Sequence, residues 1–195
     1  MATYLLLPRS RPDDDGIAPY CDGAVRFSVE LSAVEVEAFD IAGARRWRGS
    51  FGMPPSSEMY ARGCSHVVIE SSLLVFGFAE HARGATWHLP FFACLDADGA
   101  VRWRHPWWVS DSLALRDGIL YVAVAVGETA PSQLVLRAID FATGEVILDH
   151  PVAVLDTYGP PDGHARFVQD GVGAAPDLRL QVRPARGAPL DVLVP

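Results

Sequence analysis

A strand-turn-strand signature that recurs along the chain constrains the fold more than any other feature. Its three clear copies contain Asp40, Asp96 and Asp140, and each aspartate is followed within four residues by a glycine and then by a second apolar segment. The aspartates lie 56 and 44 residues apart, and a period of about 40–50 residues is typical of repeated four-stranded sheets. The sequence therefore predicts an all-β protein built from copies of one small sheet.

Each position of the repeat has an expected physical role. We expect the aspartate to fold its carboxylate back onto the following backbone amides as an Asx-turn, and the glycine to supply the left-handed conformation that closes the hairpin. We expect the tryptophan to pack against the next sheet, where its replacement by Ala would cost about 3–5 kcal/mol. The residues concerned are Asp40, Gly43 and Trp47 in the first copy, Asp96, Gly99 and Trp103 in the second, and Asp140, Gly144 and Leu148 in the third.

The segments between the turns have the patterns of strands. Val34, Val36 and Ala38 alternate with Glu35 and Glu37, which is the period of a strand with one buried face. Uninterrupted apolar runs, typical of strands buried on both faces, occupy residues 67–69, 73–76, 119–126 and 134–136. Apolar stripes at helical spacing are missing from every window of a dozen residues, so we expect no long helix.

We expect these strands to form a single small β-propeller domain, residues 1–195, with about four blades of four antiparallel strands. The expected blades span approximately residues 1–52, 64–108, 109–152 and 163–195, with residues 4–7 as the first strand of the first blade and a degenerate fourth blade. The main alternative is a half-propeller that dimerises into an eight-bladed ring. A β-sandwich is the third possible fold. A closed disc predicts a monomer, whereas the half-propeller predicts a homodimer.

The repeat also resembles that of a known family. Ala138, Asp140, Thr143 and Gly144 match, position for position, the tryptophan-docking repeat Ala-x-Asp-x-x-Thr-Gly-x-x-x-Trp of PQQ-like (quinoprotein-type) β-propellers, with Leu148 in place of the Trp. The other two copies keep the Asp, the Gly and the Trp, but they are one residue shorter between Asp and Gly and lack the Thr. The resemblance covers residues 24 to 150, with a weak extension to residue 195.

The resemblance implies a blade, but it is unspecific for an activity. Quinoprotein dehydrogenases with this repeat have many blades, a bound quinone with calcium and often adjacent cysteines. This chain has about four expected blades and no adjacent cysteines. The resemblance therefore implies the cofactor-free branch, whose propellers serve as protein-interaction scaffolds.

Charge and composition restrict the expected partners and compartment. A net charge of -8 disfavours nucleic acid, which requires a clustered Lys/Arg surface, and fits either a basic partner or simple solubility. No stretch approaches the ~18 consecutive apolar residues of a membrane span, and the N-terminal segment lacks the basic region of a signal peptide. Cys21, Cys64 and Cys94 are odd in number and widely spaced, which suits a reducing compartment. We therefore expect a cytoplasmic protein.

Three loops that lead from one expected blade to the next carry Met, Trp or Tyr beside proline. Aromatic residues and Met are enriched in interface cores, and preordered loops lose less entropy on binding. Propeller geometry would gather the three loops on one side of the disc, which predicts a partner-binding face; inter-blade packing is the alternative for the two tryptophans. The candidate partner-binding residues are Met53, Met59, Tyr60, Trp107, Trp108 and Tyr158.

Candidate residues for chemistry fit simpler interpretations. Asp13, Asp14 and Asp15 could hold a cation, but consecutive carboxylates diverge, and we interpret them as a solvated loop. Cys64 and His66 lack the second ligand pair of a structural zinc site and the third group of a catalytic dyad, so we interpret them as a buried pair. The chain has no nucleophile elbow and no phosphate-cradling loop. We therefore expect no catalytic residue, no metal and no cofactor.

These observations together predict a non-catalytic, protein-binding β-propeller. A sharper form of this hypothesis is an immunity-type inhibitor that neutralises a basic toxin or another basic partner. The alternative is a small-ligand- or metal-dependent enzyme that uses the central channel of the propeller. The third hypothesis is an orphan structural domain.

Overall fold

A computed structural model describes residues 5–8, 17–20, 23–30, 33–52, 59–81, 88–127, 130–170, 177–184 and 187–195. Within these residues the chain is entirely β, with sixteen strands in antiparallel sheets and no helix. The predicted all-β class is confirmed. Accordingly, the described part of the chain contains no helix that is long and apolar enough to cross a membrane.

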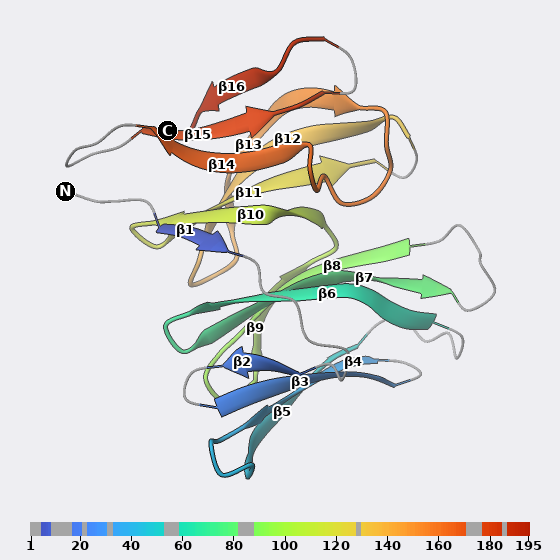
Figure 1. The fold of residues 1–195 in the computed structure, drawn as a ribbon, viewed down its shortest axis with the longest axis vertical. Helices are drawn as coiled ribbons and strands as arrows, with labels where there is room; N and C mark the ends of the chain where they lie inside the picture. The colour runs from blue at the N-terminus through green and yellow to red at the C-terminus, as the bar shows by residue number, and fades with distance from the viewer. Residues whose placement is uncertain are drawn as a thin grey trace. The chain divides into compact units, whose positions relative to one another are not determined.

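The chain forms two compact units, each with two sheets (Figure 1). Unit 1 comprises Met1–Arg9 and Trp107–Pro195, and unit 2 comprises Ser10–Pro106. The expected single domain over residues 1–195 stays a prediction.

Unit 2 contains two four-stranded meanders, which correspond to the first two expected blades. The first consists of β2 (Ile17–Tyr20), β3 (Gly23–Glu30), β4 (Ala33–Phe39) and β5 (Arg45–Gly52). The second consists of β6 (Met59–Ile69), β7 (Ser72–His81), β8 (His88–Leu95) and β9 (Val101–His105).

Unit 1 contains a five-stranded and a three-stranded sheet. The five-stranded sheet has the order β1 (Leu5–Pro8), β10 (Trp108–Arg116), β11 (Ile119–Val126), β12 (Ser132–Asp140) and β13 (Val146–Leu155). The other sheet consists of β14 (Ala165–Asp170), β15 (Asp177–Val182) and β16 (Leu190–Leu193). The expected four strands per sheet is therefore wrong for both sheets of unit 1 as described.

The placement of residues 4–7 in the first blade is wrong. Residues 5–8 form β1, which pairs with β10 so that Leu5 lies opposite Leu115 and Leu7 lies opposite Leu113 (Figure 1). The first four-stranded sheet begins instead with β2, which is separated from β3 by only two residues. A local hairpin closes at low entropic cost, so β2 occupies that edge and leaves β1 to pair with the apolar strand β10.

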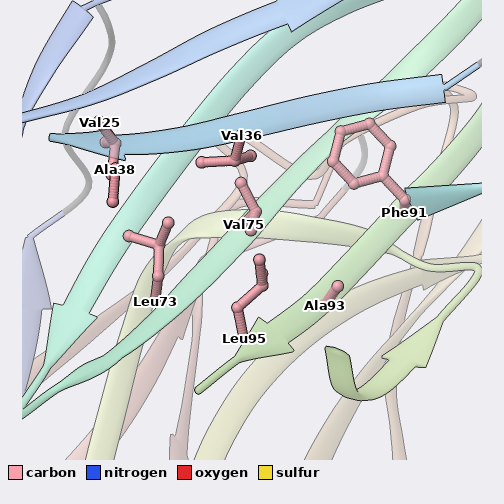
Figure 2. Packing of buried hydrophobic residues seen from close by; sticks show 8 residues of the cluster. All are labelled: Val25, Val36, Ala38, Leu73, Val75, Phe91, Ala93 and Leu95. Atoms are coloured by element: carbon pink, nitrogen blue, oxygen red, sulfur yellow. The ribbon is translucent and has the colours of Figure 1, made fainter. Parts of the chain in front are cut away.

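The two sheets of unit 2 bury one hydrophobic core between them. Val36 and Ala38 of β4 are fully buried, whereas Glu35 and Glu37 alternate with them and pair with Arg48 and Arg45. Figure 2 shows the buried side chains of the two sheets pointing toward one another, and the cluster consists of Val25, Val36, Ala38, Leu73, Val75, Phe91, Ala93 and Leu95. The predicted alternation is confirmed for residues 35–38 of β4, and the Val34 side chain lies outside the described part of the chain.

Two of the uninterrupted apolar runs are buried on both faces over most of their length. In β11 every residue from Leu120 to Ala125 is buried, and in β7 the same holds from Ser72 to Phe76. The β10–β11 hairpin turns at Asp117 and Gly118, whose φ angles are 51° and 77°, as a type I′ turn requires. These strands form the centres of their sheets.

The three repeat hairpins have the hydrogen bonds of the expected Asx-turn. The Asp40 Oδ1 accepts from the amides of Ala42 and Ala44 at 2.9 and 2.8 Å. Asp96 accepts equivalent bonds from the amides of Asp98 and Ala100, whereas the Asp140 Oδ1 accepts from the Thr143 amide at 2.8 Å and from the Thr143 hydroxyl at 3.0 Å. The repeat glycines are all left-handed, with φ angles of 81°, 81° and 77°. The aspartate side chains therefore bond to residues that are close to them in sequence, as expected.

The tryptophan of the first copy lies on the glycine of the second. A Cβ built on Gly99 would lie 2.4 Å from Cε3 of Trp47, whereas one built on Gly43 would meet no atom within 4 Å. A Cβ on Gly49, two residues after Trp47 in β5, would lie 2.7 Å from the Gly99 carbonyl oxygen. The two sheets of unit 2 can approach this closely only because both positions lack a side chain.

Replacement of Asp96 by Ala is expected to destabilise unit 2 by about 1–2 kcal/mol, because two amide donors lose their carboxylate acceptor. Asp98 is exposed in the same turn, so Asp98→Ala is the matched control and should change stability by less than about 0.5 kcal/mol. Urea unfolding followed by circular dichroism measures both values. Equal losses for the two variants would show that the Asx-turn contributes nothing measurable.

Candidate functional site

The sequence-predicted partner-binding residues are divided between the two units. Met59 and Tyr60 are the first residues of β6 in unit 2, and Met53 lies outside the described residues. Trp107, Trp108 and Tyr158 belong to unit 1. In unit 1, the structure brings the side chains of Trp108 and Tyr158 together.

The Trp108 and Tyr158 rings form an edge-to-face pair. Their centroids are 5.7 Å apart and their planes meet at 80°. Trp108 is 6% exposed, so packing accounts for most of its surface, whereas Tyr158 is only half-buried. The Ser132 hydroxyl donates a 2.7 Å hydrogen bond to the Thr157 carbonyl and so ties the loop after β13 to the start of β12. The Tyr158 ring is thus held in place by contacts within unit 1.

Trp107 is covered by a cation that the sequence reasoning missed. The Arg137 guanidinium lies over the Trp107 ring, 4.3 Å from its centroid. The same guanidinium donates two hydrogen bonds to the Asp149 carboxylate, at 3.1 and 3.4 Å, across the β12–β13 pair. The signal in the sequence was a single arginine within the otherwise apolar run of β12. Asp149 offsets the charge of Arg137, so this stack adds no net positive charge to the surface.

The chain around Tyr158 is acidic and partly apolar. Residues 145–163, here called the acidic segment, carry Glu145, Asp149, Asp156 and Asp162 and no Lys or Arg. β13 within this segment exposes 53% of Ile147 and 59% of Val154. The segment therefore combines four carboxylates with exposed apolar side chains and one ordered aromatic ring.

Among the candidates for metal or nucleophilic chemistry, the structure describes the side chain of His66. His66 is 2% exposed, and the β6–β7 register shifts between Arg62 and Ser65, so Cys64 lies in a bulge. In the described ranges no group of three or more His, Cys, Asp or Glu side chains could hold a metal ion. The run Asp13 to Asp15 lies outside those ranges.

Cys94 is a buried thiol held in its neutral form. Its exposed fraction is 0%, and burial raises the pKa of the thiol from 9.0 to about 11, although the nearby Arg102 charge acts in the opposite direction. The thiolate is the nucleophilic form of cysteine. Cys94 is therefore a packing residue at neutral pH.

The raised pKa of Cys94 predicts a loss of stability at alkaline pH. Below pH 9 the thiol is protonated in both states, and its contribution to the free energy of unfolding is complete. As the pH rises from 9 through 11 the unfolded thiol ionises first, so wild type should lose up to about 3 kcal/mol relative to Cys94→Ala. Urea unfolding of both proteins at pH 8 and pH 11 measures this difference, and identical pH dependences would contradict it.

No protein-family model matches the chain, and no curated protein matches it significantly. The resemblance of the three hairpins to PQQ-like repeats therefore stays a prediction.

Proposed function

We propose that this chain is a non-catalytic, protein-binding β-propeller of PQQ-like repeats, and that it acts as an immunity-type inhibitor by capping a basic partner protein. The acidic segment with its ordered Tyr158 ring is the observation that carries the binding part of the proposal. The Asx-turn hairpins and the packing of Trp47 against Gly99 support the propeller part of the proposal.

Further support for the propeller comes from the sheet β6–β9. One of its faces joins the core of unit 2, through Leu73 and Val75 among others. The other face carries Phe76, Phe92 and Trp103, which are also buried. A sheet that is apolar and buried on both faces is suited to a blade with a neighbour on either side.

The chemistry of the acidic segment favours a basic partner. The carboxylates of Glu145, Asp156 and Asp162 attract Lys and Arg side chains, and an aromatic face binds the same cations through its quadrupole. A net charge of -8 would also speed the encounter with a basic protein at low salt. The same segment also exposes the apolar side chains of Ile147 and Val154. A surface of this kind binds a cationic protein and repels an acidic one.

Affinity capture from the native host tests the proposal. The wild-type protein should retain a partner of pI above about 9, more weakly at high salt, whereas the variant Tyr158→Ala/Asp156→Asn should lose it. The control Ile41→Ala/Asp98→Asn removes one exposed apolar side chain and one charge from unit 2, and it should retain the partner. Capture of acidic proteins alone, or equal capture by both variants, would contradict the proposed binding surface.

The inhibitor part has its own test once the partner is purified. Expression of that partner in a heterologous cell should be toxic, and co-expression of the wild-type chain should restore growth. Co-expression of the Tyr158→Ala/Asp156→Asn variant should not restore it. A partner that is harmless when expressed alone would overturn the immunity role while leaving protein binding intact.

A further inference from the structure

Unit 1 contains a small cavity at the β14–β15 hairpin, which shares only Gly163 with the acidic segment. Its volume is about 260 Å³, and it is lined by Gly163, His164, Ala165, Arg166, Gln181 and Arg183. Three of these six residues can carry positive charge and none is acidic. In a chain with a net charge of -8, this is an unusual local composition.

Arg166 is held in a fixed orientation at this cavity. It lies opposite Gln181 in the β14–β15 register, and its Nε and Nη2 atoms donate to the Gln181 Oε1 at 3.1 and 3.0 Å. Two of its five N–H groups are used in this way, so three remain for a ligand. The Gln181 amide nitrogen also keeps its two donors, because only its oxygen is engaged with Arg166.

His164 and Arg183 are joined across the base of the same hairpin. The Arg183 amide donates to the His164 carbonyl at 2.7 Å, and the His164 Nδ1 lies 3.0 Å from the Arg183 carbonyl oxygen. A carbonyl oxygen can only accept, so Nδ1 carries a proton and Nε2 is the ring nitrogen left for a ligand. The Arg183 side chain is exposed and can contribute all five of its N–H donors.

We propose that this cavity binds a phosphate group, either as free phosphate or as the monoester of a small metabolite. Two guanidinium groups match the oxygen spacing of phosphate with paired N–H donors, and the Gln181 amide adds neutral donors. Imidazole Nε2 can accept the proton of a monoprotonated phosphate, or donate to a phosphate oxygen when the ring is charged. Asp162 directly precedes Gly163 in the chain, and Asp191 lies opposite Gln181 in the β15–β16 register. Neither aspartate lines the cavity.

Isothermal titration at low ionic strength tests this site with inorganic phosphate and with glycerol 3-phosphate as the two probes. At least one probe should bind the wild-type protein, and Arg183→Gln should weaken that binding by at least about tenfold, the loss of one charge-assisted hydrogen bond. Tighter binding of glycerol 3-phosphate would support a monoester as the ligand, and equal or tighter binding of phosphate would support the free ion.

The control for charge alone is Arg45→Gln in unit 2, which removes an exposed arginine far along the chain and should leave the dissociation constant within about twofold of wild type. Arg166→Lys keeps the charge at the cavity but loses the paired donors, so it should weaken binding as well. Circular dichroism shows that each variant is folded. Absence of binding by both probes, or equal weakening by Arg183→Gln and Arg45→Gln, would overturn the proposal.

Discussion

Trp47→Ala should lower the free energy of unfolding of unit 2 by about 2–3 kcal/mol. The ring is half-buried and packs against the core shared by the two sheets, so the cost should fall below the ~3–5 kcal/mol of a fully buried tryptophan. Removal of the ring would also remove the atoms that pack against Gly99. Urea unfolding followed by far-UV circular dichroism gives the value without depending on the tryptophan signal.

Trp47→Phe is the matched control for this substitution. It keeps an aromatic face over Gly99 and should cost about 1 kcal/mol, because a smaller ring fills most of the same space. A loss below about 0.5 kcal/mol for Trp47→Ala would mean that the ring does not hold the two sheets together.

Phe92→Ala should have the largest effect of any substitution considered, about 3–5 kcal/mol. Phe92 is fully buried in β8. Its ring packs edge-on against the rings of Trp103 and Phe76, with centroid distances of 5.3 and 6.1 Å. The substitution removes both aromatic contacts and leaves a cavity in a close-packed region.

If Phe92→Ala is too unstable to purify, Phe92→Leu measures the same site. Leu restores most of the volume but neither edge-to-face contact, so we expect a loss of about 1–2 kcal/mol. Denaturant unfolding of both variants, with Ile41→Ala as an exposed control, gives the comparison. If the unfolding midpoint of Phe92→Leu equals that of the wild type, the assigned role of the aromatic contacts is contradicted.

The parts of the fold that were predictable are those with local causes. Asp96 and Gly99 form their turn through hydrogen bonds that span at most four residues, so the sequence alone contains the cause. The alternation of Val36 and Ala38 with Glu35 and Glu37 likewise fixes which face of β4 is buried.

The pairing of β1 with β10 could not be predicted, because it depends on competition between distant edges. The four residues of β1 are apolar enough to extend any sheet, and no local signal distinguishes the first sheet from the third. The outcome follows from β2, which occupies the first sheet through a short connection. Long-range strand pairing of this type is decided by the whole fold.

The candidate site was predictable in its aromatic residues and not in their partners. Trp108 and Tyr158 were identified from composition, and they do contact one another. Arg137 was missed because its role depends on Trp107, directly before β10, and on Asp149 of β13. The cavity at His164 was missed for the same reason, since Arg183 joins it only through the pairing of β14 with β15.

A double-mutant cycle between Trp47 and Gly99 tests the central claim that the tryptophan of one repeat sits on the glycine of the next. Gly43 and Gly99 share a φ angle of 81°, so Ala should cost about 1–2 kcal/mol at either position through backbone strain. In the wild-type background Gly99→Ala should cost about 1–3 kcal/mol more than Gly43→Ala, because its Cβ meets the Trp47 ring. In the Trp47→Ala background the two costs should become equal, whereas equal costs in the wild-type background would contradict the claim.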